Sequence, residues 1–185
     1  KQMDASIPDV SSTSWASFFT GANPAEHGIF GFMGLRNNTY SLSFPTYDDI
    51  KAPSLWEMLN GGASSGRRSV LSDEYRGRFE RPLWSVVLNI PQTYPARPMN
   101  GLLTAGFVSP DFRKGTYPAS LYDYLSGTGY IPDVDSNKAA EDKDAFFREI
   151  FTSLDKREEA YLHLMKTEEW DLFIGVFTGT DRMHH

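Results

Sequence analysis

The 185-residue sequence contains no cysteine. Disulfide-stabilised scaffolds, zinc sites built from thiolates and cysteine nucleophiles are therefore excluded for these residues. Basic residues are few as well: 18 Lys and Arg stand against 24 Asp and Glu, which gives a formal net charge of −6. Since proteins that bind nucleic acid usually carry a basic face, the sequence predicts no nucleic-acid partner.

Long apolar runs are also absent, because no run approaches the roughly 20 residues of a membrane-spanning helix. The opening residues, KQMDAS, do not have the pattern of a secretory signal. We therefore predict no membrane partner and a cytoplasmic protein. With 40% hydrophobic and 23% charged residues, the composition is typical of a globular domain with a buried core. The oligomeric state has no signal in the sequence.

Two common enzyme motifs are missing too. The sequence has no G-x-x-x-x-G-K-[ST] loop of the kind that binds nucleotide phosphates. It also has no G-x-S-x-G elbow of a serine hydrolase. The sequence therefore indicates neither a nucleotide-binding loop of this kind nor a serine hydrolase with this elbow.

Strand and helix patterns alternate along the chain. Two continuous β-branched and aromatic runs, residues 83–90 and 170–177, predict strands that are buried on both faces. The other predicted elements are helices over residues 14–19, 51–60, 119–125 and 138–169, a short strand over 130–134, an irregular loop over 91–98 and a mobile connection over 61–69. Strands joined by helices of this length predict an α/β fold with a largely parallel sheet.

Ligands of parallel sheets bind beyond the carboxyl ends of the strands, so the loops after Ile90 and Phe177 are informative. The second loop reads TGTDRMHH and places Asp181 and His185 four residues apart. On a helix such a pair shares one face and can bind one metal ion, with Zn²⁺ or Mn²⁺ suited to these donors. The alternatives are that Asp181 caps a helix and that the final two histidines begin an affinity tag.

A cluster of hydroxyl side chains, SSTS, occupies residues 11–14 just before an aromatic-rich segment. At a helix start, unpaired N–H groups and the helix dipole favour an anion, so the Ser11 oxygen could hold a phosphoryl group there. The alternative is that Ser11 or Ser12 simply caps the helix. His27, in the turn-rich segment PAEHGI, is expected to brace its loop and not to bind metal.

The run IPDVSSTSWASFFTGANPAEHGIFGF resembles the nucleophile segment of the alkaline phosphatase superfamily, in particular its type I phosphodiesterase/nucleotide pyrophosphatase branch. In that branch a Ser or Thr precedes a helix that ends in Thr-Gly, followed by x-x-Pro-x-x-His-Gly-Ile. The later segments LNIPQTYPARP and WDLFIGVFTGTDRMHH are similar to the same branch. Sulfatases instead use C/S-x-P-x-R at the nucleophile, where this sequence has SSTSW.

The resemblance implies an alkaline-phosphatase-like three-layer α/β/α fold with a largely parallel sheet, incomplete at both ends. Residues 1–185 are then expected to be part of a single catalytic domain. The family also uses an Asp before this segment and further Asp and His ligands after it. We therefore expect the sequence to be a piece of a longer protein and to be inactive alone.

The resemblance further implies a metal-dependent hydrolase of small phosphate esters that acts through a phosphoseryl intermediate. Ser11 falls on the nucleophile, and Asp181 and His185 fall on two metal ligands. Two divalent metal ions are implied, with Zn²⁺ favoured and Mn²⁺ as the alternative, and Ser11 contacts one of them. Other hypotheses are a metal-dependent phosphomutase, which also uses a serine, and a non-catalytic binding module or incomplete fragment.

Overall fold

The computed structural model describes residues 6–35, 39–60, 81–136 and 138–184. The connection predicted over residues 61–69 and the predicted ligand His185 lie outside these ranges. A four-stranded sheet in the order β5-β4-β3-β6 forms the centre of the described molecule. Its strands are β3 (Ser85–Ile90), β4 (Gly101–Ala105), β5 (Thr116–Tyr117) and β6 (Leu172–Gly175). Strands β4 and β6 run parallel to β3, whereas β5 is antiparallel to β4.

Strand β3 lies between β4 and β6, and all of its residues are buried. Val86 and Leu88 belong to one apolar cluster, and Val87 and Ile90 belong to the cluster on the other face. Val87 and Ile90 share a face because a bulge at Asn89, with a left-handed φ of 64°, inserts one residue between them. The strand thus contributes to both cores, as its continuous apolar sequence predicts.

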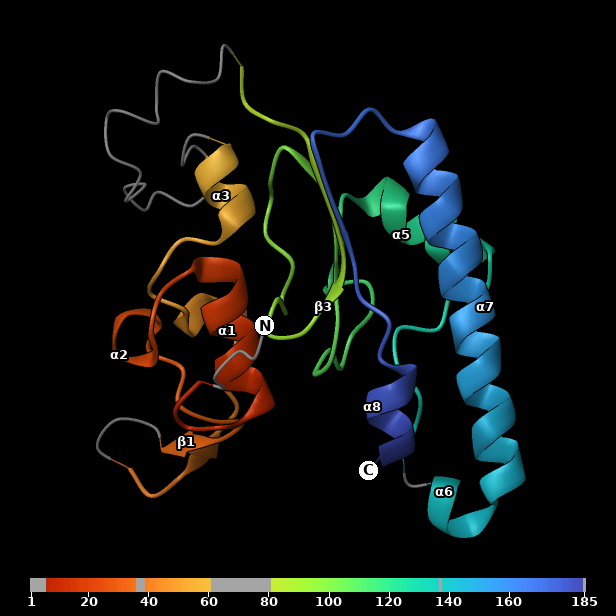
Figure 1. Ribbon diagram of the computed structural model, residues 1–185, viewed down its shortest axis with the longest axis horizontal. Helices are drawn as coiled ribbons and strands as arrows, with labels where there is room; N and C mark the ends of the chain where they lie inside the picture. The colour runs from red at the N-terminus through yellow and green to blue at the C-terminus, as the bar shows by residue number, and fades with distance from the viewer. Residues whose placement is uncertain (1–5, 36–38, 61–80, 137, 185) are drawn as a thin grey trace, which may run out of the picture.

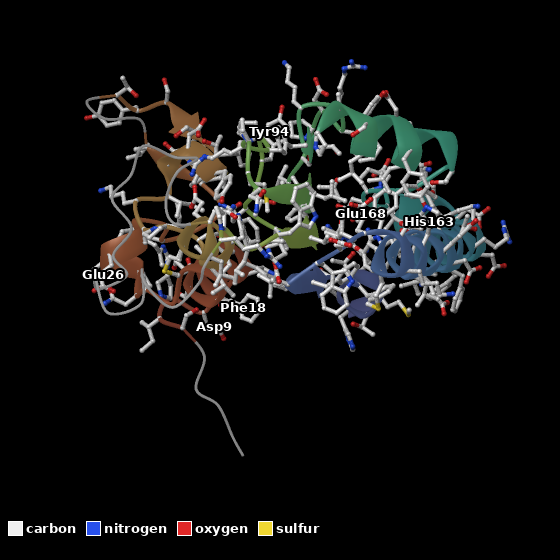
Figure 2. The ribbon with its side chains drawn as sticks, turned by 90° about the horizontal axis from the view of Figure 1, so that it is seen from above. Asp9, Phe18, Glu26, Tyr94, His163 and Glu168 are labelled. Atoms are coloured by element: carbon white, nitrogen blue, oxygen red, sulfur yellow. The ribbon has the colours of Figure 1, made fainter. Side chains whose placement is uncertain are left out.

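Helices cover both faces of the sheet (Figure 1), with α1 and α3 on one side and α5 and α7 on the other. Seen from above, Glu26 of α2 and His163 of α7 stand on opposite sides (Figure 2). These helices are α1 (Ser11–Thr20), α2 (Pro24–His27), α3 (Leu55–Leu59), α5 (Ala119–Gly127) and α7 (Lys143–Thr167). The predicted α/β class with layers of helices around a largely parallel sheet is confirmed.

Short elements complete the described ranges. They are the antiparallel pair β1 (Gly34–Leu35) and β2 (Leu42–Ser43), the 3-10 helix η1 (Tyr47–Asp49), and the helices α6 (Lys138–Glu141) and α8 (Gly179–His184). Helix α8 follows β6 and carries the predicted ligand Asp181. In the described part of the chain, no helix combines the length and apolar character needed to cross a membrane.

The short strand predicted over residues 130–134 is wrong. This segment pairs with no strand, and its backbone oxygens are used by side chains of α7 instead. Ile131 O accepts a hydrogen bond from Ser153, and Pro132 O accepts one from Arg157. Pro132 also lacks the N–H that a strand needs. The apolar residues of this segment are therefore part of a loop between α5 and α6.

Strand β4 was not predicted from the sequence. It is short, reads GLLTA and begins with a glycine, a residue that is depleted in strands. The structure explains the glycine: at Gly101 φ is +150°, and a Cβ would lie 1.8 Å from the Ser85 carbonyl oxygen on β3. The close approach of two backbones, which the sequence does not reveal, makes glycine the residue that fits there.

Two predicted elements differ in length from those observed. The helix predicted over residues 138–169 is divided at Asp142, whose side chain accepts a hydrogen bond from Ala145 N and caps the start of α7. The strand predicted over residues 170–177 pairs with β3 only over Leu172–Gly175. The residues after it leave the sheet and turn into α8, which begins at Gly179.

The predicted helices at residues 51–60 and 119–125 are present as α3 and α5. Ser54 caps α3, because its side chain accepts a hydrogen bond from Glu57 N and the Glu57 carboxylate accepts one from Ser54 N. The proline-rich segment over residues 91–98 is irregular, also as predicted. These agreements share a cause: each element is specified by residues that are close together in the sequence.

Candidate active site

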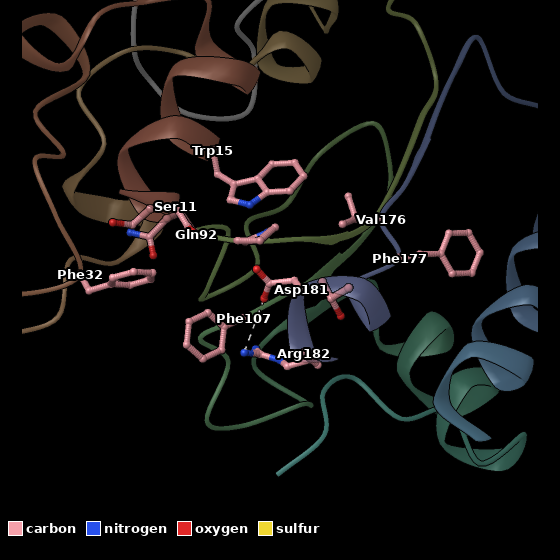
Figure 3. A pocket seen from close by; sticks show the side chains of 12 residues that line it. Ser11, Trp15, Phe32, Gln92, Phe107, Val176, Phe177, Asp181 and Arg182 are labelled. Carbon is pink, nitrogen blue, oxygen red and sulfur yellow. Dashed lines mark ion pairs between the residues drawn. The ribbon is translucent and has the colours of Figure 1, made fainter. Parts of the chain in front are cut away.

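A cavity of about 330 Å³ lies where the carboxyl ends of the parallel strands meet the start of α1 (Figure 3). Residues that directly follow β3, β4 and β6 contribute to its wall, as the rule for parallel sheets predicts. Its lining consists of Ser11, Ser12, Trp15, Phe32, Pro91, Gln92, Phe107, Val176, Phe177, Thr178, Asp181 and Arg182.

Ser11 is the first residue of α1, and the helix starts three residues earlier than predicted. The N-cap is Val10, which makes no side-chain capping bond, so capping by Ser11 or Ser12 is wrong. No capping side chain therefore covers the N–H groups of the first turn of α1. These donors and the positive end of the helix dipole face the cavity, where they favour an anion such as a phosphate.

The two adjacent serines differ in accessibility. Ser12 lines the cavity wall but is only 1% exposed, and its buried hydroxyl has no hydrogen-bond partner among the described residues. Ser11 is exposed at the mouth of the same helix. A nucleophile must reach a phosphorus atom that arrives from solvent, so the geometry favours Ser11 over Ser12.

Asp181 lies on α8, across the cavity from Ser11 (Figure 3). The structure thus brings two residues from opposite ends of the sequence to one edge of the sheet. Asp181 is the third residue of α8, so the alternative that it is the N-cap is wrong. Its side chain is 53% exposed. The partner that the helical spacing predicts for it, His185, lies outside the described residues.

The described donors suit a hard divalent cation. Asp181 contributes carboxylate oxygens and Ser11 a hydroxyl oxygen, which are ligand types accepted by Mg²⁺, Mn²⁺ and Zn²⁺. Among residues 6–35, 39–60, 81–136 and 138–184, no group of three or more His, Asp or Glu side chains could hold a metal ion. The two donors therefore fit parts of a centre with two ions, in which the predicted His185 would join Asp181 and Ser11 would contact the other ion.

Other parts of the site had no signal in the sequence. The rings of Phe32 and Phe107 meet edge to face with centroids 5.9 Å apart, and both line the cavity. The Arg182 guanidinium lies 4.4 Å from the centre of the Phe107 ring and binds Asp133 through two hydrogen bonds. Arg182 stands next to Asp181 in the quoted motif, but no sequence pattern connects it to Asp133.

His27 braces the turn after α1, as predicted. Its side chain is fully buried, Nδ1 accepts a hydrogen bond from Ile29 N at 3.1 Å, and Nε2 lies 2.9 Å from Ser17 Oγ of α1. Since Nδ1 is an acceptor, the neutral ring carries its proton on Nε2 and donates it to Ser17. Burial lowers the pKa of His27 from its ordinary value of 6.5, because the buried ring is out of contact with the water that would stabilise its positive charge.

This arrangement predicts a loss of stability in mild acid. Because the folded protein disfavours protonated His27, the unfolded state binds more protons, and the free energy of unfolding falls as pH drops below about 6.5. The slope from this one group approaches at most about 1.4 kcal/mol per pH unit. Urea unfolding between pH 7.5 and 5.5 should therefore give a steeper pH dependence for the wild type than for His27→Gln.

The matched control for this prediction is His163→Gln, because His163 is exposed on α7 (Figure 2). That variant is expected to keep the wild-type pH dependence. Equal slopes for the wild type and His27→Gln would show that the buried ring has no part in acid sensitivity.

Comparison with known proteins identifies the family of the chain. A model of the family described as type I phosphodiesterase / nucleotide pyrophosphatase matches residues 1–185. In the same comparisons, no curated protein and no solved structure matches the chain. Because the family match covers the whole sequence, the chain belongs to the type I phosphodiesterase/nucleotide pyrophosphatase family of the alkaline phosphatase superfamily.

Proposed function

We propose that residues 1–185 belong to one catalytic domain that hydrolyses small phosphate esters, with Ser11 as nucleophile and Asp181 as a metal ligand. Membership of the family implies a phosphoric ester hydrolase of the phosphodiesterase or pyrophosphatase type, and this family is generally metal-dependent. The observation that supports the finer proposal is that Ser11 and Asp181 line one cavity at the carboxyl edge of the sheet.

In the proposed reaction, Ser11 Oγ forms a bond to phosphorus while the bond from phosphorus to the leaving oxygen breaks. The serine proton passes to water, and the leaving oxygen takes up a proton and is released as an alcohol or a phosphate. Water then attacks phosphorus and gives up a proton. The bond to Ser11 Oγ breaks, the serine oxygen regains a proton, and the phosphoryl group leaves as a phosphate that carries the oxygen of that water. The uncapped N–H groups of the first turn of α1 stabilise negative charge on the phosphoryl oxygens.

Divalent ions, with Zn²⁺ favoured and Mn²⁺ as the alternative, would supply positive charge to the phosphate and lower the pKa of the attacking hydroxyl. Asp181 would hold one ion together with His185, and Ser11 would contact the other. The aromatic side chains of Trp15, Phe32 and Phe107 line the same cavity and offer an apolar wall to the organic part of the ester.

The test is an assay of the natural protein that contains these residues, with bis(p-nitrophenyl) phosphate as diester and p-nitrophenyl phosphate as monoester. We expect turnover that EDTA abolishes and that Zn²⁺ or Mn²⁺ restores. The absence of turnover with both esters, in protein that binds the added metal, would contradict the proposed hydrolase and support the non-catalytic alternative.

The isolated residues 1–185 are expected to show no turnover in the same assay. A catalytic zinc ion usually has three protein ligands. Among the proposed ligands, residues 1–185 supply only Asp181 and His185 to one ion and only the nucleophile Ser11 to the other. Isothermal titration calorimetry of this segment should accordingly show weak metal binding. Stoichiometric binding with high affinity would show that the segment already contains a complete metal site.

A further inference from the structure

Helix α8 has only six residues, and isolated helices of this length are unstable in water. Its position therefore depends on contacts with the rest of the molecule. These contacts matter for function because Asp181 lies on this helix. Three contacts hold the helix, and each is made by a residue of α8 or by the residue directly before it.

The first contact joins α8 to the loop after α5. Arg182 Nε donates to Asp133 Oδ1 at 2.9 Å, and Arg182 Nη2 donates to Asp133 Oδ2 at 2.6 Å. The Arg182 side chain is only 10% exposed and stacks on the Phe107 ring, so the arginine of this two-point ion pair is shielded from solvent. The remaining guanidinium nitrogen, Nη1, lies 3.8 Å from Asp181 Oδ2.

The second contact fixes the residue before α8. Arg157 on α7 is 1% exposed, and its Nη1 donates to Thr178 Oγ1 at 2.7 Å while its Nη2 donates to Pro132 O at 2.7 Å. In the amide orientation that satisfies its neighbours, Asn89 accepts a hydrogen bond from Arg157 Nη1 and donates one to Pro132 O. The described residues place no carboxylate within ion-pair distance of Arg157, so the cation is held by neutral oxygens.

The third contact is close packing. A Cβ at Gly179, the first residue of α8, would lie 3.1 Å from the Leu154 side chain of α7. The gap that remains between α7, α8 and the loop after α5 is only about 10 Å³. The helix therefore packs closely against α7, and a shift toward α7 would bring its atoms into steric clash with that helix.

We infer that Arg182 and Asp133 are positioning residues that hold the Asp181 carboxylate toward the Ser11 cavity. The inference rests on the proposed function, because it takes Asp181 to be a metal ligand. Arg182 adjoins Asp181 in the chain, so the direction of the Arg182 side chain toward Asp133 sets the rotation of the short helix about its axis. Loss of the pair frees that rotation and weakens the metal site without removing a ligand.

The chain offers a matched control for this inference. Arg81 also binds an aspartate through two hydrogen bonds: its two terminal nitrogens donate to Asp171 at 2.7 and 2.9 Å. The two aspartates have similar exposure, 30% for Asp133 and 25% for Asp171. Asp171 precedes β6, however, and so lies at the amino end of the strand, away from the cavity.

The test measures Mn²⁺ affinity by calorimetry in the natural protein for the wild type, Asp133→Asn, Asp171→Asn and Asp181→Asn. We expect Asp133→Asn to weaken Mn²⁺ binding about 10- to 100-fold, the range found for partners of metal ligands, and Asp171→Asn to change it less than about twofold. The Mn²⁺ concentration for half-maximal turnover should rise with Asp133→Asn, whereas turnover at saturating Mn²⁺ should stay close to that of the wild type.

Arg182→Lys keeps the charge but loses the two-point geometry, so it should weaken Mn²⁺ binding as Asp133→Asn does, and the double variant should be no weaker than either. If Asp181→Asn weakens binding but Asp133→Asn and Arg182→Lys do not, the positioning role is wrong and the proposed metal ligand stands. If Arg182→Lys raises the KM for the ester at unchanged Mn²⁺ affinity, Arg182 contacts substrate instead. If Asp181→Asn binds Mn²⁺ normally, both proposals are wrong.

Discussion

Replacement of Ser11 by alanine is expected to lower the turnover of phosphate esters at least about 10³-fold, which corresponds to ~4 kcal/mol of transition-state stabilisation. In the proposed reaction, the variant loses the atom that forms the covalent bond to phosphorus, and we expect no adjacent hydroxyl to replace it. Ser12, the nearest candidate, is buried in the helix. The free energy of unfolding should change by less than about 0.5 kcal/mol, because Ser11 is exposed and makes no capping bond.

The decisive measurement is acid quenching during turnover, followed by mass spectrometry of the peptide that contains residues 11–14. The wild type should carry one phosphoryl group on Ser11, and Ser11→Ala should carry none. Ser12→Ala is the control: the hydroxyl that it removes is buried and has no partner among the described residues, so activity and labelling should persist. Labelling of Ser11→Ala together with loss of labelling in Ser12→Ala would assign the nucleophile to Ser12.

Replacement of Asp181 by asparagine is expected to abolish high-affinity metal binding and to lower turnover about 10³-fold at low metal concentration. Asparagine preserves the size of the side chain but removes the negative charge that attracts a divalent cation. Because the Asp181 side chain is about half exposed, the fold should tolerate the change, and the melting temperature should stay close to that of the wild type.

Calorimetric titration with Zn²⁺ and Mn²⁺ tests this expectation directly, and activity measured against metal concentration provides a second readout. A large excess of metal should restore part of the turnover of Asp181→Asn, because the remaining ligands still bind the ion weakly. Asp123→Asn, which changes an exposed carboxylate on α5, is the control for loss of one negative charge. Similar effects of the two substitutions would indicate that only the overall charge matters.

Local sequence patterns predicted much of the fold. The continuous apolar run of β3 and the alternation of strands with helices led to the parallel sheet, because these patterns reflect burial on two faces. Helix α3, predicted over residues 51–60, is also specified locally, because the residues that cap its start, Ser54 and Glu57, are three positions apart. Elements specified by distant contacts were missed: β4 depends on the close approach of Gly101 to Ser85, and the loop after Tyr130 depends on hydrogen bonds from α7.

For the candidate site, too, local patterns were predicted from the sequence, whereas contacts between distant segments were not. The sequence by itself determined which segments are proposed to carry the chemistry, since the serine-rich helix start and the TGTDRMHH segment are contiguous motifs whose residues are neighbours in the chain. Only the tertiary structure decided that Ser11 is accessible whereas Ser12 is buried, and that Asp133 binds the arginine beside Asp181. The physical reason is that exposure and ion pairing depend on which distant segments pack together, and this packing leaves no short-range pattern in the sequence.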